Sequence, residues 1–297
     1  MSAADPAARR ATLLAAMPAV FVLVWSTGFV VARYGMPHAP PLGFLTLRYA
    51  LSVAAFGAWI TIARAAWPVG RAQWLHLAVT GALMHAGYLG GVWAAVKAGI
   101  GAGTVALIIG LQPVLTAIWL SLPGGTRAIS RRQWLGLLLG LGGLLLVVGH
   151  KVGVGEVTAF NFGLAVFALL SITVGTLYQK RFVKPCDVRT ANAIQLGAAL
   201  LVTAPLAVLE GGAWQMHPQL VGAMAWSVLV LTLGGSSMLY LLIQRGAAAK
   251  VTSLLYMVPP CASLLAWWLF GEPLSAQVLA GIAVTAVGVA LVVRSRG

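Results

Sequence analysis

The sequence predicts an all-α integral membrane protein, and two properties of the chain carry this prediction. Of its 297 residues, 60% are hydrophobic and only 8% are charged. This composition leaves too little polar surface to coat a soluble globule, so the bilayer is the expected solvent. Charged, Pro/Gly-rich or Trp-flanked breaks also divide the chain into apolar segments of about 20 residues, the length that a membrane-spanning helix needs.

Ten transmembrane helices follow from these breaks, and the connections between them are too short to hold a soluble domain. Their expected cores are Leu13–Val31, Leu42–Ala63, Trp74–Val96, Ala102–Leu122, Gln133–Gly149, Phe160–Gln179, Asn192–Leu209, Leu220–Ile243, Val251–Phe270 and Ala276–Val293. The formal charge of +14 does not indicate a nucleic-acid partner, because no stretch is polar enough to form a basic domain.

The distribution of basic residues predicts the orientation, because cytoplasmic loops carry an excess of Lys and Arg. With the N-terminus inside, all nineteen Lys and Arg residues lie on the cytoplasmic side except Arg33, Lys97 and Lys151, which lie outside, and Arg48, which lies within the second span. Both termini are then cytoplasmic.

A five-helix unit is predicted to occur twice, as residues 1–150 and 151–297. An offset of about 146 positions places Pro113 opposite Pro259 and the triplet Ala19–Phe21 opposite Ala165–Phe167. Because five is odd, the second unit enters the membrane from the opposite side. The expected architecture is therefore a pair of inverted repeats around a central cavity.

The prolines of the fourth and ninth spans are predicted hinges. Pro113, Pro259 and Pro260 each remove a helix hydrogen bond and crowd the carbonyl four residues earlier. A carbonyl freed in this way is costly in lipid, so it is expected to face protein or a water-filled cavity. The alternative is a structural kink that only shapes the packing of the helices.

His85 and Tyr88 are candidates for the cavity lining, because they lie one turn apart near the middle of the third span. An imidazole at this depth is not expected to face lipid. The alternative is a hydrogen bond to a neighbouring helix that holds the bundle together without touching a substrate.

Other polar and aromatic residues interrupt the apolar spans and are further candidates for the cavity lining. Ser and Thr hydroxyls often bond back to their own helix instead, so each of them alone also has a purely structural explanation. The full substrate-cavity set is Trp25, Ser26, His85, Tyr88, Ser171, Tyr178, Ser237, Tyr240, Gln244 and Tyr256.

Arg48 lies about two turns inside the second span, where its side chain could extend to the outer interface or point inward at an anion. Extension to the interface is the expected arrangement.

The acidic residues Asp5, Glu156, Asp187, Glu210 and Glu272 all fall in tails, loops or helix ends. A carboxylate proton relay is therefore not expected, and His85 is the obvious protonation site.

No enzymatic activity, metal or cofactor is expected. The chain has no Walker-type glycine loop, no Cys/His cluster with metal-ligand spacing and no nucleophile elbow.

Several segments resemble the EamA-type branch of the drug/metabolite transporter superfamily. In the second half the resemblance rests on Tyr240, Pro259, Gly271–Glu272 and Gly281–Gly288. In the first half it rests on Pro40, on LRYA at Leu47–Ala50 and on GLQPVLTAIW at Gly110–Trp119. Arg127 stands about where the family usually repeats the acidic residue, so Glu272 is expected to cap helix ends rather than act as one of a symmetric pair.

The resemblance implies ten helices in two five-helix repeats and a bacterial-type inner-membrane protein, similar to the aromatic and other amino-acid exporters. The expected function is a secondary transporter that exports amino acids or related small metabolites by alternating access. A flippase for lipid-linked substrates or nucleotide sugars is the nearest alternative, and a membrane enzyme or a non-transporting scaffold is a more distant one. The oligomeric state stays open, with a monomer as the working expectation.

Overall fold

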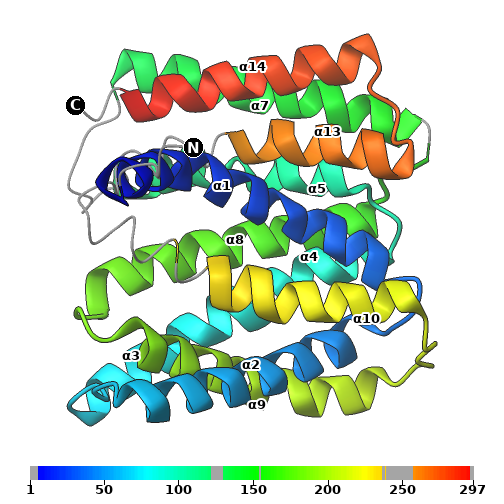
Figure 1. The fold of residues 1–297 in the computed structure, drawn as a ribbon. Coiled ribbons are helices and arrows are strands. Elements are labelled where there is room, and N and C mark those ends of the chain that lie inside the picture. Colours follow the sequence, from blue (N-terminus) through cyan, green and yellow to red (C-terminus); the bar gives the residue numbers. More distant parts are fainter. Residues whose placement is uncertain (1–5, 122–129, 154, 236–237, 239–256, 295–297) are drawn as a thin grey trace, which may run out of the picture.

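The computed structural model describes residues 6–121, 130–153, 155–235, 238 and 257–294, and in these ranges every regular element is a helix (Figure 1). Within these ranges, six stretches are long and apolar enough to cross a membrane, namely Pro41–Ala63, Arg71–Lys97, Trp134–Val152, Ala159–Phe182, Val188–Glu210 and Pro218–Gly235. Shorter apolar helices cover Ala19–Gly35, Ala102–Thr116, Val258–Phe270 and Ala276–Leu291. The predicted all-helical membrane class is confirmed, and each stretch overlaps a predicted span.

The helices follow one another in an order set by the breaks in the sequence. They are α1 (Pro6–Gly35), α2 (Pro41–Ala63), α3 (Arg71–Gly81), η1 (Ala82–Gly87), α4 (Tyr88–Lys97), α5 (Ala102–Ile109), α6 (Gln112–Ser121), α7 (Arg131–Gly153), α8 (Ala159–Phe182), α9 (Val188–Glu210), α10 (Pro218–Ala225), η2 (Trp226–Gly235), α13 (Val258–Phe270) and α14 (Ala276–Arg294).

The helices lie roughly side by side in one bundle (Figure 1). The pair α7 and α14 forms one edge, and the pair α2 and α9 forms the opposite edge. Between these edges α1 packs on α13, α13 packs on α5, and α4 packs on α8. The interior of the bundle is therefore built from α1, α4, α5, α8, α13 and the two η segments.

Glycines bring the backbones of neighbouring helices into contact. An ideal Cβ on Gly81 would lie 2.1 Å from the carbonyl oxygen of Gln195, and one on Gly91 would lie 2.9 Å from the carbonyl oxygen of Leu164. At the opposite edge, a Cβ on Gly288 would lie 2.4 Å from the nitrogen of Gly140. Small residues allow such close approach between membrane helices, so these glycines fix how α3 and α4 lie against α8 and α9, and how α7 lies against α14.

Two π-helical segments, η1 and η2, lie within longer helical stretches where the sequence predicted uniform helices. A π segment shifts the register of the following residues and often occurs at functional sites. The spacing that places His85 and Tyr88 one turn apart in a regular α-helix is therefore altered, since η1 ends at Gly87 and α4 begins at Tyr88.

The fourth predicted span is broken, as its proline indicated. The helix α5 ends at Ile109, a turn covers Gly110 and Leu111, and α6 begins at Gln112 next to Pro113. In the ninth span, Pro259 and Pro260 lie in the first turn of α13, where a missing N–H costs no helix bond. Residues 239–256 lie outside the described ranges, so the expected bend in the middle of that span stays a prediction.

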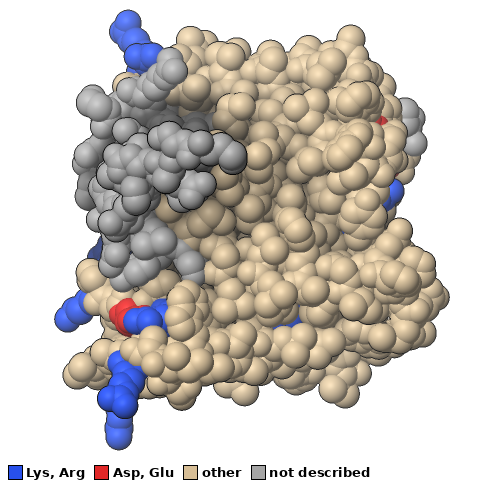
Figure 2. Space-filling view, viewed as in Figure 1, with Lys and Arg blue, Asp and Glu red and all other residues tan. Residues whose placement is uncertain are grey.

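The surface drawn in Figure 2 is almost uncharged between its two ends. Lys and Arg side chains gather near the end where α2 meets α3 and α8 meets α9. In the connection before α9, Asp187 accepts a hydrogen bond from the Arg189 side chain, which lowers the pKa of the Asp187 carboxyl. Large apolar side chains along the helices are exposed, as expected for contact with lipid; they include Leu145, Phe167, Leu201, Leu229 and Trp268.

Candidate functional site

Polar side chains from three elements meet around His85, halfway along the stretch Arg71–Lys97. The Tyr49 hydroxyl of α2 donates to the main-chain carbonyl of His85 at 2.7 Å, and the two rings lie edge to face with centroids 6.2 Å apart. From α9, Gln195 lies beside the His85 side chain. A hydrogen bond between His85 and a neighbouring helix is thus present through the main chain of His85, and the role of its imidazole toward a substrate stays a prediction.

Arg48 points inward, and the expectation that its side chain reaches the outer interface is wrong. Its side chain is buried, with 7% of the residue exposed, and Nε and Nη2 donate to Thr232 Oγ1 of η2 at 3.3 and 3.1 Å. Arg48 also interacts electrostatically with Tyr49, Tyr88 and His85. Because α2 packs against η2, a hydroxyl acceptor is available deep in the bundle, and the guanidinium bonds to it instead of extending toward water.

Tyr88 and Ser171 lie beside this group. Tyr88 is buried at the start of α4, within electrostatic range of Arg48. Ser171 of α8 packs against η1, since an ideal Cβ on Gly87 would lie 2.9 Å from the Ser171 hydroxyl oxygen. The structure therefore brings Tyr88, Ser171 and His85 to one region of the bundle.

Trp25 and Ser26 of α1 lie in a second region. Trp25 is half-buried and packs on Phe21, with ring centroids 5.2 Å apart. The Ser26 hydroxyl is buried and donates to the carbonyl of Val22 at 2.7 Å, with a longer contact of 3.4 Å to the carbonyl of Val258. Ser26 thus has the structural bond that serines commonly form in helices, and it also connects α1 to the start of α13.

Tyr178 belongs to a third group, at the end of α8 near the α8–α9 connection. Its hydroxyl shares a hydrogen bond of 2.8 Å with Nδ1 of His76, and its ring packs on Phe182. The other predicted lining residues, Ser237, Tyr240, Gln244 and Tyr256, lie outside the described residues, as does Arg127.

The two predicted hinge regions meet in space. An ideal Cβ on Gly110, at the break between α5 and α6, would lie 2.6 Å from Cγ of Pro259. A pocket beside this contact is lined by Pro259, Pro260 and residues of α14. Beyond the break, Gln112 Nε2 donates to the Thr176 hydroxyl of α8 at 2.9 Å. The break in the fourth span is therefore held between α13 and α8.

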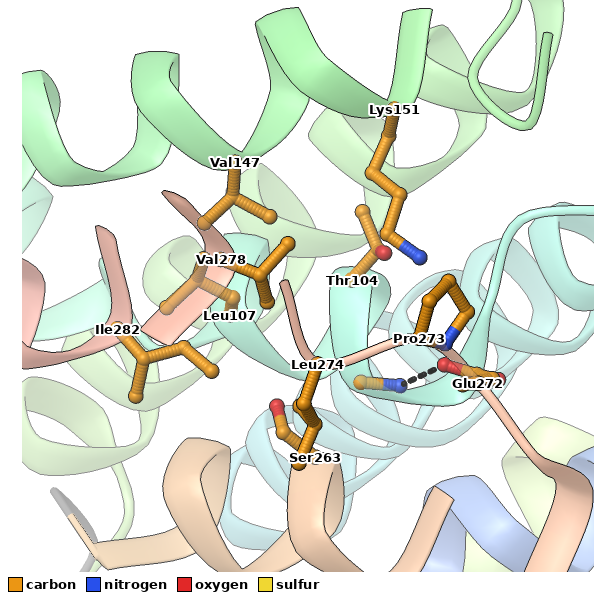
Figure 3. Close-up of a pocket in the computed structure, with 11 residues that line it drawn as sticks. Thr104, Leu107, Val147, Lys151, Ser263, Glu272, Pro273, Leu274, Val278 and Ile282 are labelled. Atoms are coloured by element: carbon orange, nitrogen blue, oxygen red, sulfur yellow. Dashed lines mark hydrogen bonds between the residues drawn. The ribbon is translucent and has the colours of Figure 1, made fainter. Parts of the chain in front are cut away.

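A second pocket lies at the end of the bundle where α13 meets α14 (Figure 3). Glu272 accepts hydrogen bonds from the nitrogens of Ala102 and Gly103, at 2.9 and 3.4 Å, in the first turn of α5. Glu156 accepts from the Thr104 hydroxyl and pairs with Lys151 at 2.5 Å. The expected capping role of Glu272 is confirmed, and the favourable interaction of carboxylates with a helix N-terminus explains it.

Sequence reasoning missed several polar residues that the structure places near Arg48 and His85. Thr232, Ser52 and Ser227 were not selected, although each interrupts an apolar span. That interruption was the only available signal, and it could not show which of these residues face one another. Among the described residues, no group of three or more His, Cys, Asp or Glu side chains could hold a metal ion.

Comparison with known proteins identifies relatives along nearly the whole chain. The model of the EamA-like transporter family matches residues 11–149 and 160–294. A Salmonella typhimurium protein described as a probable amino-acid metabolite efflux pump is 25% identical over 277 residues, which cover 90% of each chain. An Escherichia coli protein with the same description is 24% identical and covers 80% of each chain.

An uncharacterised transporter of Bacillus subtilis is 24% identical over 302 residues, covering 97% of this chain and 92% of the relative. A solved structure superimposes with a TM-score of 0.65 at 17% identity, covering 93% of this chain and 95% of the other. This likeness shows a shared fold. The family and the descriptions of the relatives indicate a transporter rather than an enzyme.

Proposed function

Because the chain belongs to the EamA-like transporter family, we propose that it is a secondary transporter that exports amino acids or related small metabolites by alternating access. Two relatives are described as probable amino-acid metabolite efflux pumps, which supports this class of substrate. A small-molecule substrate and a bilayer environment follow from the family itself.

The observation that carries the proposal is the polar group in the middle of the bundle. The Tyr49 hydroxyl donates to the main-chain carbonyl of His85, and Gln195 lies beside the His85 side chain, at a depth where a membrane protein normally places apolar side chains. No described carboxylate joins this group, because Glu156, Asp187, Glu210 and Glu272 all bond to partners at the helix ends. Such a lining favours a small zwitterion over a bulky cation.

Two structural features support ten helices arranged as inverted repeats. An offset of about 146 positions relates Pro113 to Pro259, and the same offset places η1 at residues that lie within η2. It also relates α2 to α9 and α7 to α14, and the members of each of these two pairs pack against each other. Contact between equivalent helices is what a two-fold axis between residues 1–150 and 151–297 would produce.

The contact between Gly110 and Pro259 supports a hinge at the broken helices. The break between α5 and α6 lies at this contact, opposite the first turn of α13. We place the bending of the transport cycle here, with Pro113, Pro259 and Pro260 limiting how each helix can straighten. The proposed orientation has both termini on the cytoplasmic side of a bacterial-type inner membrane.

Reconstitution in liposomes tests the proposed function. Liposomes loaded with a mixture of amino acids should release at least one of them faster than protein-free liposomes, down its own gradient. With no carboxylate relay, an imposed pH gradient should drive little accumulation, and any that occurs should depend on His85. Strong proton-driven accumulation that persists in the His85→Ala variant would contradict this mechanism, and no release of any amino acid would contradict the proposed function.

A further inference from the structure

The guanidinium of Arg48 is a buried positive charge whose hydrogen bonds to the described residues all go to one neutral side chain. Nε and Nη2 both donate to Thr232 Oγ1. That hydroxyl in turn donates to the main-chain carbonyl of Ser227 at 2.8 Å, so it is oriented to accept from Arg48. An arginine carries five N–H donors and stays charged in proteins, so one hydroxyl satisfies only part of its capacity.

No carboxylate among the described residues pairs with Arg48. Glu210 accepts from the nitrogens of Leu42 and Gly43 in the first turn of α2, and Glu272 accepts from α5. Glu156 pairs with Lys151, and Asp187 pairs with Arg189. A buried cation without a counter-charge is costly, and it is usually compensated by an opposite charge.

Two hydroxyls near this cation lack hydrogen-bond partners in the described structure. Ser52 lies one turn after Arg48 on the same face of α2, and Ser227 lies on η2 at the carbonyl that orients Thr232. Both serines are 0% exposed, and both hydroxyl oxygens are unpartnered. Buried hydroxyls normally form hydrogen bonds. The contact between α2 and η2 therefore holds two hydroxyl groups that can still donate, next to a positive charge without a counter-ion.

We infer that Arg48 binds the carboxylate of the transported solute, with the Ser52 and Ser227 hydroxyls as additional donors. A planar guanidinium matches a carboxylate in geometry and can donate two parallel hydrogen bonds to it. The inference rests on the proposed function and narrows its substrate class to solutes with a free carboxylate. Amines and esters of the same side chain lack the negative charge that Arg48 requires.

The test compares three solutes that share one side chain: phenylalanine, its methyl ester and phenethylamine. Their release from liposomes, and their effect on the thermal unfolding of the purified protein, are measured at one pH. The wild-type protein should prefer the free acid by about tenfold or more, the scale of a charged hydrogen bond. Arg48→Gln should remove the preference, and Arg48→Lys should keep part of it, since a lysine supplies charge without the planar fork.

Arg33→Gln is the matched control. Arg33 lies at the end of α1 with its guanidinium carbon 6.0 Å from the centroid of the Phe270 ring, so its loss should leave the preference unchanged. A folded Arg48→Gln protein that still prefers the acid would overturn the inference. Equal transport of all three solutes by the wild-type protein would also overturn the inference. This comparison needs no variant, and its outcome does not contradict the proposed function. Release of none of a wider set of amino acids would instead overturn the proposed function itself.

Discussion

Tyr49 connects two helices through a single hydroxyl. It lies beside Arg48 on α2 and donates to a carbonyl inside η1, while its own side chain is buried. A carbonyl in a π segment at membrane depth needs a donor, because no water competes for it there. The Tyr49 hydroxyl therefore helps to hold His85 in place without being a candidate for substrate contact itself.

Replacing Tyr49 with Phe should remove this bond while keeping the packing of the ring. The expected loss is about 0.5 to 1.5 kcal/mol of stability, the usual net value of one hydrogen bond, together with slower transport because His85 loses its support. Thermal unfolding in detergent and release from liposomes measure the two effects. The control is Tyr34→Phe, since Tyr34 packs on Phe270 through its ring. Equal behaviour of the two variants would contradict this role of Tyr49.

At the scale of single residues, the sequence predicted how deep a polar residue lies in its span better than it predicted which neighbouring helix the side chain faces. The sequence shows that Arg48 lies in an apolar span. Its partner Thr232 is 184 positions away, and no residue near Arg48 in the sequence indicates that α2 and η2 meet. Ser26 shows the opposite case. Its bond to Val22 lies within its own helix, so local reasoning foresaw it.

At the scale of elements, the broken fourth span is the clearest link between sequence and mechanism. Pro113 lacks the N–H that would bond to Ile109, and a turn at Gly110 and Leu111 separates α5 from α6. Gly110 has no side chain, and this lets Pro259 approach the break closely. The break is therefore both local in cause and fixed by a contact from the other half of the chain.

Pro113→Ala should allow a continuous helix from α5 to α6 and so slow transport severalfold, because the proposed bend loses its cause. Insertion in the membrane and thermal stability should be retained. Pro205→Ala is the matched control, because Pro205 lies inside α9, which continues without a break on an exposed face. Transport by Pro113→Ala at the rate of Pro205→Ala would contradict the hinge.

Element boundaries were predictable where charge or proline marks them, and the π segments were not. The segment α8 ends next to Lys180 and Arg181, and α2 begins at a proline pair. By contrast, η1 differs from an α-helix by a register shift that no residue in Ala82–Gly87 requires. On either side of η1, Gly81 lies close to Gln195 and Gly91 lies close to Leu164. These contacts join helices that are distant in the sequence, so the sequence of one apolar segment does not show them.

At the scale of the whole molecule, the two ends of the bundle carry different charges. Arg33, Lys97 and Lys151 share one end with Glu156 and Glu272, while Lys180, Arg181 and Arg189 lie at the other end around the α8–α9 connection. By the positive-inside rule, this distribution supports the proposed orientation, with the second end in the cytoplasm.

Cysteine labelling tests this orientation. In a variant without Cys186 and Cys261, Val69→Cys should react with a membrane-impermeant reagent only from the cytoplasmic side, and Met216→Cys only from the outside. Val69 is 94% exposed between α2 and α3, and Met216 is 83% exposed between α9 and α10, so both sites are accessible. Labelling of both from the same side, or from reversed sides, would contradict the orientation.

Counterflow distinguishes alternating access from passage through a channel. Liposomes holding the protein and a high concentration of an exported amino acid are diluted into buffer with a trace of the same labelled amino acid. A carrier that exposes one site to each side in turn must accumulate the label transiently above its outside concentration, because outward transport of unlabelled solute returns the site for inward loading. Alternating access predicts this overshoot. Release of the amino acid without an overshoot, as through a channel, would contradict it.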